Sequence, residues 1–495
     1  MDALIQGFSM LMDPFNVVLI FIAVLIGVCV GALPGLSSPM AIALLLPFSI
    51  SLEPIPAIAM MASLYCAGTF GGSITAILLN TPGTPMNAAT CLDGHPMAQK
   101  GEAKKALGIA ATASGLGALF GILILLLILP AVRRVILLFG PPEFFVLVLF
   151  GLSTVALAAK GSFLKGLIAG GIGILLSLIG YSEVFGGLRF TYGSEHLWDG
   201  FSLVPVLVGI FAVSELINYA LRGGTIASVP TSRSGRILDG VKEVFRHKLN
   251  FFRSASIGTI IGIIPGVGGT AANFIAYIVA KQHAKHPETF GSGNPEGVIA
   301  SESANNAKDG GALLPTVGFG IPGSAEMAIL LGAFILHGLT PGPMLVKENI
   351  DIVIALVFGL VISNVIASTF GLLTADILAK ITRINVKYIV PIVLAFCFVG
   401  AYAMRENIWD VLVTLIFGIF GYGMIRHGFS QVCLVIGFVL GVLAEKSFHQ
   451  SIMMSYGSYK IFFLRPISLF LILLLIFLIL FPLVKKKLTS GSENA

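Results

Sequence analysis

Charged residues are scarce in this sequence. Asp, Glu, Lys and Arg make up 11% of the chain, whereas hydrophobic residues make up 56%. Soluble domains carry about 25% charged residues, so a soluble fold would lack the charge to cover this much apolar surface. A lipid bilayer removes that need because its hydrocarbon solvates apolar side chains. The composition therefore predicts an all-α polytopic membrane protein that has the lipid bilayer as a partner.

Basic residues are absent from the start of the chain, since no Lys or Arg precedes Lys100. The tail before the first apolar run, 15–33, carries Asp2 and Asp13 and lacks the basic region of a cleavable signal peptide. Cytoplasmic segments of membrane proteins are enriched in Lys and Arg. We therefore expect a periplasmic N-terminus and, from the three lysines at 485–487, a cytoplasmic C-terminus. The net charge of +6 has the same origin and does not predict binding to nucleic acid.

Motifs of catalysis and metal binding are also missing. The five cysteines form no CxxC pair, and the sequence contains no HExxH, GxSxG or Walker A pattern. His283 and His286 lie three residues apart without further ligands nearby, which favours a solvated loop over a metal site. We expect no enzyme activity, no cofactor and no metal ion other than Na⁺ as a coupling ion.

Long apolar runs cover most of the chain. A helix needs about 20 apolar residues to cross the hydrocarbon core, and several of the runs are shorter or interrupted by Pro-Gly. We therefore expect about twelve transmembrane helices together with broken or re-entrant ones. The runs are 15–33, 36–50, 55–79, 104–132, 143–159, 163–180, 203–221, 254–280, 311–338, 350–379, 387–404, 407–425, 430–444 and 463–484.

Two pairs of motifs indicate an internal repeat. The segment 27–35 matches 258–266, so that Pro34 corresponds to Pro265 at an offset of 231 positions (265 − 34). Further along, 80–84 matches 320–324 at an offset of 240 positions (322 − 82). Because the two matches occur in the same order, duplication explains them better than chance.

The segment 222–253 separates the two halves and is rich in basic residues. We interpret it as a cytoplasmic linker with an amphipathic surface helix at 236–249. The predicted organisation is then membrane repeat 1 at 1–221, membrane repeat 2 at 254–484 and a cytoplasmic tail at 485–495. A tail outside and a linker inside would give the repeats opposite orientations, which is a recurring plan of secondary transporters.

Four Pro-Gly pairs predict broken helices, at Pro34, Pro82, Pro265 and Pro322. Proline removes a backbone donor, and glycine permits the change in backbone direction that follows. Unpaired peptide groups cost several kcal/mol in lipid, so breaks persist where protein, water or a ligand pairs them. A kinked helix without a ligand is the alternative interpretation of each single pair.

Small polar residues surround these breaks. A new helix N-terminus suits a carboxylate, and the preceding C-terminal carbonyl groups suit Na⁺. We therefore predict substrate binding by Gly35, Ser37, Ser38, Asn80, Thr81, Gly83, Thr84, Gly266, Gly268, Gly269, Thr270, Asn273, Gly323 and Ser324.

A polar stretch at 296–311 has two interpretations. Glu302, Asn305, Asn306 and Asp309 have helical spacing, so several of them can share one helix face. Acidic groups at membrane depth are often ion or proton sites, which makes Glu302, Asn305 and Asn306 candidates for ion coupling. The alternative is a solvated segment that leads into the next helix.

Several of these motifs resemble one known family, the large membrane subunit of tripartite tricarboxylate transporters (TctA family). The resemblance runs from about residue 10 to 480 and keeps the order of the motifs. Its stretches are 33–47, 76–85, 92–98, 265–269, 302–306, 320–323 and 337–343.

The resemblance implies a multi-pass protein of a bacterial inner membrane, with a periplasmic solute-binding protein and a small membrane subunit of about four helices as partners. It implies uptake of a carboxylate, such as citrate or another di- or tricarboxylate, driven by a Na⁺ or H⁺ gradient. An organic-anion carrier or exporter that works without a binding protein is the alternative function. A polytopic membrane enzyme is a third, for which we find no catalytic pair.

Overall fold

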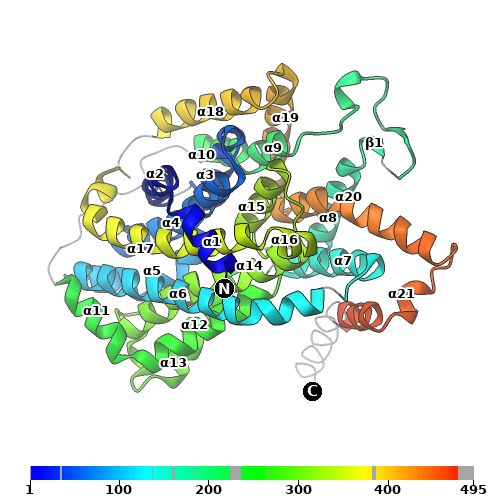
Figure 1. Ribbon diagram of the computed structural model, residues 1–495. Coiled ribbons are helices and arrows are strands. Elements are labelled where there is room, and N and C mark those ends of the chain that lie inside the picture. Colours follow the sequence, from blue (N-terminus) through cyan, green and yellow to red (C-terminus); the bar gives the residue numbers. More distant parts are fainter. Residues whose placement is uncertain are drawn as a thin grey trace, which may run out of the picture.

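The computed structural model describes residues 2–33, 36–136, 138–158, 162–182, 184–222, 236–265, 267–381 and 386–477. Almost all of its elements are helices (Figure 1), which confirms the predicted all-α class. Within these residues, one small antiparallel sheet pairs β1 (Gly180–Ser182) with β2 (Gly187–Arg189).

The first set of helices precedes Leu138. It comprises α1 (Asp2–Leu11), α2 (Pro14–Gly31), α3 (Ser38–Leu45), η1 (Pro47–Ser51), α4 (Pro54–Leu79), η2 (Pro85–Asn87), α5 (Ala88–Gln99) and α6 (Ala103–Ile136). The corresponding second set comprises α11 (Ile237–Arg246), α12 (Lys248–Ile263), α13 (Gly268–His283), η5 (Pro287–Thr289), α14 (Pro295–Phe319), α15 (Ala325–Leu336), α16 (Pro343–Glu348) and α17 (Ile350–Ile381).

The remaining helices flank these two sets. They are α7 (Pro141–Ala158), α8 (Phe163–Ser177), η3 (Glu195–Leu197), α9 (Leu203–Leu207), η4 (Val208–Val213), α10 (Ser214–Arg222), α18 (Val386–Ala403), α19 (Ile408–His427), α20 (Gln431–Met454) and α21 (Ile461–Leu464).

Twelve helical segments in the described residues are apolar, but only seven of them are long enough to cross a bilayer, so the expected number of about twelve crossings stays a prediction. Seven have the length to cross it: Pro14–Gly31, Pro54–Leu79, Ala103–Val132, Leu203–Leu221, Ile350–Ala375, Ile408–His427 and Gln431–Met454. Five are shorter: Pro141–Leu157, Phe163–Ser177, Ala325–Leu336, Ile389–Ala403 and Pro466–Phe477.

Helices α4 and α14, which correspond to each other in the predicted repeat, end in the same way. Helix α4 ends at Leu79 and is capped by Asn80, which is left-handed with φ 53°, and α14 ends at Phe319 and is capped by Gly320 with φ 70°. Left-handed residues commonly end helices because they turn the chain while pairing the last carbonyl groups. Each end is followed at once by a Pro-Gly pair, so the next helix starts in a new direction.

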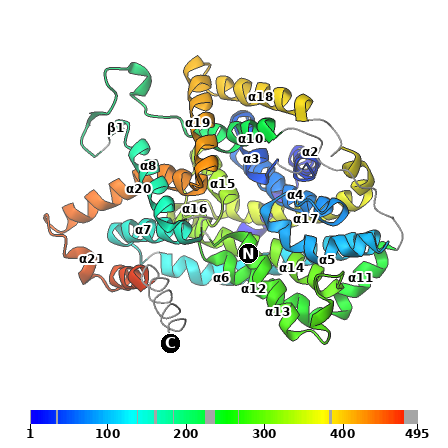
Figure 2. The ribbon, with the colours of Figure 1, turned by 180° about the vertical axis from the view of Figure 1, so that it is seen from behind.

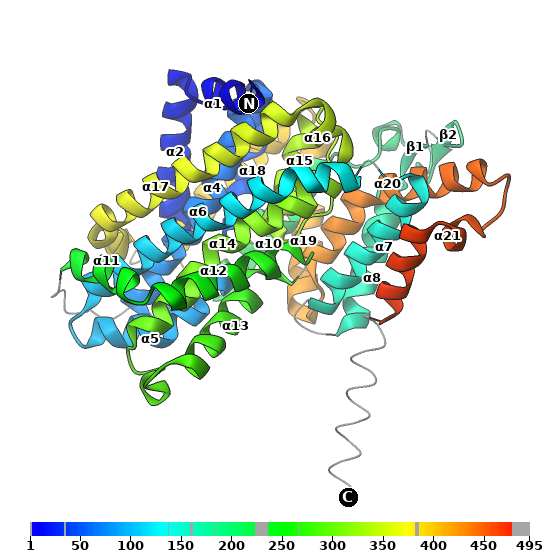
Figure 3. The ribbon, with the colours of Figure 1, turned by 60° about the horizontal axis from the view of Figure 1, so that its bottom comes forward.

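The packing between the sets is reciprocal. Helix α6 of the first set packs along α14 of the second, and α17 of the second packs along α4 of the first. Figure 3 shows α6 and α17 crossing the body of the molecule beside α4 and α14. From behind, α12 and α13 lie against α14 (Figure 2). Helices α4 and α14 are therefore enclosed by protein on all sides.

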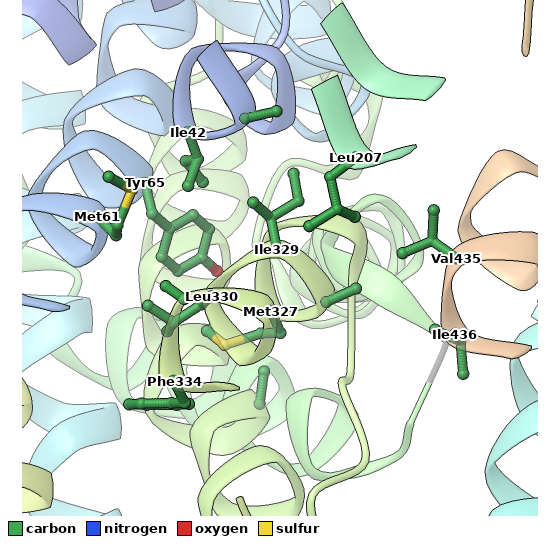
Figure 4. Close-up of a cluster of buried hydrophobic side chains, with 14 of the residues drawn as sticks. Ile42, Met61, Tyr65, Leu207, Met327, Ile329, Leu330, Phe334, Val435 and Ile436 are labelled. Carbon is green, nitrogen blue, oxygen red and sulfur yellow. The ribbon is translucent and has the colours of Figure 1, made fainter. Parts of the chain in front are cut away.

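Helices α7, α8 and α20 pack together at one end of the molecule, and η4 packs on α19. A shared apolar core joins this end to the repeats (Figure 4). Met327 and Ile329 of α15 lie between Tyr65 of α4 and Val435 of α20.

The structure bears on three sequence expectations. As the Pro-Gly pairs predict, the runs 254–280 and 311–338 are interrupted at Pro265 and Pro322, and each contains parts of two helices. The stretch 296–311 lies inside α14 and is buried from Gly297 onward, so the solvated alternative is wrong. The surface helix expected at 236–249 is present as α11, which ends at Arg246 and packs on α6.

Candidate functional site

The helix breaks meet around α4 and α14. A Cβ built on Gly83 would lie 2.0 Å from the Gly31 carbonyl oxygen and 2.5 Å from the Gly72 Cα, so the second break packs on the end of α2. In the second set, a Cβ on Gly323 would lie 3.4 Å from the Gly262 carbonyl oxygen. Gly323 corresponds to Gly83 at the offset of 240, and Gly262 corresponds to Gly31 at the offset of 231. The same arrangement therefore occurs twice.

Three predicted residues, Pro34, Gly35 and Gly266, lie outside the described residues. Their neighbours are placed at the starts of α3 and α13. Ser37 is half-buried at the N-cap of α3 without a side-chain cap bond, and Ser38 is fully buried with an unpaired hydroxyl oxygen. Helix α3 in turn packs on α15, which begins after the fourth break.

The second break divides its predicted residues into two groups. Asn80 is exposed, and the Thr81 hydroxyl donates to the Leu79 carbonyl at 2.9 Å, so both finish α4. The Thr84 hydroxyl donates to Asn87 Oδ1 at 2.6 Å, and together these residues form a capping box at the start of η2. The structure thus gives Thr84 a capping bond.

A chain of buried hydrogen bonds leads from this break to Glu302. Asn87 donates to Ser73 Oγ at 2.8 Å, and Ser73 donates to Glu302 Oε2 at 2.9 Å. Ser114 donates to the same carboxyl oxygen at 2.7 Å, while Thr90 donates to Glu302 Oε1 at 2.5 Å. Glu302 is therefore fully buried yet receives three hydroxyl donors from three different helices.

The third break touches the second. Asn273 of α13 donates to the Met86 carbonyl at 2.8 Å, and its own Oδ1 is buried without a partner. Gly269 lies beside Met86 as well. Gly268 is left-handed with φ 72° at the first residue of α13, which only glycine adopts at little cost, and Thr270 is half-buried in the first turn.

The fourth break is capped like the second. Ser324 is the N-cap of α15, and its hydroxyl accepts a bond from the Met327 amide at 3.3 Å. Pro322 and Gly323 are buried. Thr84 and Ser324 thus occupy equivalent positions and both cap the helix that follows a break.

The amides on α14 are only partly paired. Asn306 donates to Asn364 Oδ1 of α17 at 2.6 Å, but its own Oδ1 has no partner. Both polar atoms of Asn305 are unpaired although the residue is fully buried. Buried polar atoms without partners cost free energy, and such atoms can mark a site that a ligand completes.

The sequence reasoning missed a buried ion pair one turn further along α14. Lys308 Nζ donates to Asp309 Oδ1 at 2.6 Å and to the Tyr65 hydroxyl at 2.5 Å, while the Tyr65 hydroxyl also bonds to Asp309. Lys308 and Asp309 are 2% and 1% exposed. A signal was present, because Lys308 is the one basic residue other than histidine between Lys285 and Lys347.

Asp93 is a second residue whose role the sequence did not reveal. Its Oδ1 accepts bonds from the backbone amides of Gly291, Gly293 and Asn294 at 2.7 to 2.9 Å, and Oδ2 accepts from Tyr277 at 2.8 Å. Asp93 therefore ties α5 to the loop between α13 and α14. This role is structural, since it fixes the start of α14.

A cavity of about 910 Å³ lies apart from this polar centre. Its lining includes Phe139, Phe144, Thr340, Phe438 and Lys446, and it touches the breaks at Gly320. The cavity lies between helices α7, α8 and α20 on one side and the turn after α15 on the other. The polar centre, formed by Glu302, Lys308 and Asp309 with their partners, is instead closed by protein.

Fold and site together define an all-helical, multi-pass membrane protein whose repeated, interrupted helices enclose a polar centre. Transport proteins use this combination, since broken helices at membrane depth persist where they line a protein-enclosed site. The sequence profile of the tripartite tricarboxylate transporter TctA family matches residues 17–436. The chain belongs to this family, which confirms the resemblance seen in its motifs.

Two proteins of Agrobacterium vitis are similar to this chain. One, described as "Uncharacterized 52.8 kDa protein in TAR-I ttuC' 3'region", is 34% identical over 462 residues, or 93% of this chain and 92% of that protein. The other, described as "Uncharacterized protein in TAR-II ttuC' 3'region", is 34% identical over 233 residues, or 46% of this chain and 96% of that protein. No solved structure matches the chain.

Proposed function

We propose that this chain is the large transmembrane subunit of a binding-protein-dependent secondary transporter that takes up tricarboxylates or related carboxylates, such as citrate. A periplasmic solute-binding protein delivers the substrate, and a small membrane subunit completes the complex. The observation that carries the proposal is the packing of the breaks near Gly31, Gly83, Gly262 and Gly323 around α4 and α14. This arrangement belongs to a chain of the TctA family.

The charge balance at the centre supports ion coupling. Glu302, Asp309 and Glu326 are buried there, whereas Lys308 is the one buried lysine of α14. A carboxylate substrate would add further negative charge to a site that already has more acidic than basic groups. Because unpaired buried charge is costly, a cation should enter with the substrate. Na⁺ and H⁺ both satisfy this requirement.

Membrane orientation is part of the proposal. Lys100 at the end of α5 donates to the Ser292 carbonyl at 2.6 Å, so the α5–α6 junction and the α13–α14 loop lie together. Both carry basic residues, as does α11, which packs on α6. The positive-inside rule places this side in the cytoplasm of a bacterial inner-membrane protein, with the N-terminus in the periplasm.

Reconstitution tests the function. Labelled carboxylates would be offered to proteoliposomes that contain the complete membrane complex, with and without the binding protein, under an imposed Na⁺ or H⁺ gradient. The proposal expects accumulation that requires the binding protein and one of the gradients. Uptake that ignores both gradients would contradict ion coupling. Uptake that does not need the binding protein would favour an independent anion carrier or exporter.

A further inference from the structure

The buried pair on α14 is an unusual feature for a purely structural role. Lys308 and Asp309 are adjacent in sequence, so their side chains leave the helix in different directions and the lysine must bend back to reach the carboxylate. Replacing buried ion pairs by apolar side chains often leaves stability unchanged or improves it. Stability alone therefore gives little reason for this pair inside an apolar protein.

The pair is incompletely satisfied. Lys308 bonds to Asp309 Oδ1, while Asp309 Oδ2 is buried without a partner. Asn305 lies one turn before Asp309 on α14, and both of its side-chain polar atoms lack a hydrogen-bond partner. Asn273 Oδ1, near the third break, also lacks a partner. Among these atoms Asn305 Nδ2 is a donor, from which a carboxylate can accept a bond as it does from the Lys308 ammonium, whereas Asp309 Oδ2, Asn305 Oδ1 and Asn273 Oδ1 are acceptors that suit a cation. All four residues are more than nine-tenths buried.

The lysine also lies at a helix break. A Cβ built on Gly269 would be 2.3 Å from Lys308 Cε and 2.5 Å from Met86 Sδ, so the lysine stem runs against the first turn of α13. The free amide groups of this turn add positive potential near the ammonium. The ammonium is thus placed where the third and second breaks meet.

The repeat shows what is special about this position. At the offset of 240, Lys308 corresponds to Gly68 and Asp309 to Thr69. Gly31 packs on the Gly68 carbonyl as Gly262 packs on the Lys308 carbonyl, so the backbones are equivalent. The first repeat therefore has no charge at the corresponding point. One cation at a point where only the backbone is duplicated provides one fixed anchor for an anion.

We infer that Lys308 is the counter-ion of a substrate carboxylate, and that Asp309 with Tyr65 holds the ammonium while the site is empty. This inference rests on the proposed carboxylate transport. An arriving carboxylate takes the place of Asp309 at the ammonium. Asp309 then loses its partner and takes the coupling cation, H⁺ or Na⁺, so that loading the substrate loads the cation. The proposal gives the adjacent pair two connected roles.

Three variants of the complete complex test these roles, with exposed Lys285→Gln as the matched control. Lys308→Gln should lower kcat/KM for carboxylate uptake at least about 100-fold, chiefly through KM, because a buried charged partner of the substrate is lost. Asp309→Asn keeps the ammonium, so it should retain exchange of labelled for unlabelled substrate but lose gradient-driven accumulation. Parallel Na⁺ and H⁺ gradients identify the cation that Asp309 takes.

The double variant Lys308→Gln with Asp309→Asn distinguishes this inference from a structural ion pair. It leaves no unpaired charge and should insert normally, even where Lys308→Gln alone does not. The inference expects it to lack both exchange and accumulation. Restored uptake in the double variant, or an unchanged KM in folded Lys308→Gln, would overturn the inference and leave the proposed function intact. A wild-type complex that carries no carboxylate would overturn both.

Discussion

Gly83 lies so close to Gly31 that a Cβ on Gly83 would be 2.0 Å from the Gly31 carbonyl oxygen. That oxygen belongs to the backbone at the end of α2, and it cannot move as the tip of a flexible side chain does. The second helix break therefore packs so closely on the end of α2 that a methyl group at Gly83 has no space. The equivalent contact at Gly323 is looser, at 3.4 Å from the Gly262 carbonyl oxygen.

Gly83→Ala should therefore destabilise the protein by about 1–3 kcal/mol, the usual range for overpacking a tight core. Gly323→Ala makes the same chemical change at the equivalent position and should cost less than Gly83→Ala. Thermal unfolding of the purified variants in detergent measures both effects. A third variant, Gly171→Ala, has open space at its Cβ and provides the baseline. Equal losses at Gly83 and Gly323 would show that this packing difference has no influence.

Glu302→Gln should abolish ion-coupled accumulation while leaving the protein inserted. The three hydroxyl donors from Ser73, Ser114 and Thr90 surround a carboxylate, and glutamine replaces one acceptor oxygen by a donor amide. We expect a loss of stability of about 1–2 kcal/mol because one buried bond is broken. Uptake under imposed Na⁺ and H⁺ gradients, beside a thermal unfolding curve, separates the two effects.

The matched control for this variant is Glu296→Gln, in the first turn of the same helix. Glu296 lies 3.6 Å from the His247 ring nitrogen near the surface and takes no part in the buried network. Its uptake should remain within about twofold of the wild type, since ion pairs near the surface contribute about 0–1 kcal/mol. Accumulation by Glu302→Gln equal to that of the control would argue against a role in coupling.

Asp93→Ala should loosen the loop that precedes α14. The change leaves three backbone amides and the Tyr277 hydroxyl without their acceptor, and unpaired buried groups cost about 1–3 kcal/mol each before relaxation or water entry. Hydrogen exchange at residues 288–297 should become faster. Asp93→Asn retains an acceptor oxygen for the amides and should show a clearly smaller effect. If the two variants exchange alike, Asp93 does not hold this loop.

Cysteine labelling tests the membrane orientation. In a background without the half-buried Cys29 and Cys91, Lys285→Cys should react with an impermeant thiol reagent in inverted membrane vesicles but not in intact cells. Met12→Cys should show the opposite pattern, because α1 is predicted to lie on the periplasmic side. Labelling of both positions from the same side would contradict the predicted orientation.

Much of the fold follows from features that are local in sequence. Length and apolarity identify the crossing helices, and the Pro-Gly pair at Pro322 marks the boundary between α14 and α15, just after Gly320 turns the chain in the left-handed conformation. The repeat was visible because both Pro265 and Pro34 belong to matching motifs. The start of α14 was missed because residues 296–311 are polar, and hydropathy treats polar residues as solvated even where protein encloses them.

The candidate site was predictable in outline but not in its bonds. Sequence pointed to Thr84 and Ser324 as ligands, whereas the structure gives both a capping bond. It pointed to Glu302 without identifying Ser73 or Ser114 as its partners. A hydroxyl group on α4 or α6 could face many different residues in a helix bundle. Only the packing of these helices against α14 decides that Ser73 and Ser114 face Glu302.

The sequence by itself determined that this protein resides in a membrane, and it predicts that the chain is duplicated and that its helices break at Pro-Gly pairs. These properties depend on composition and on the backbone chemistry of single residues. Only the tertiary structure decided that Lys308, Asp309 and Tyr65 meet, because Tyr65 lies 243 positions from Lys308 in the chain. Contacts over such separations arise from helix packing, which depends on the whole set of side chains that fill the space between α4 and α14.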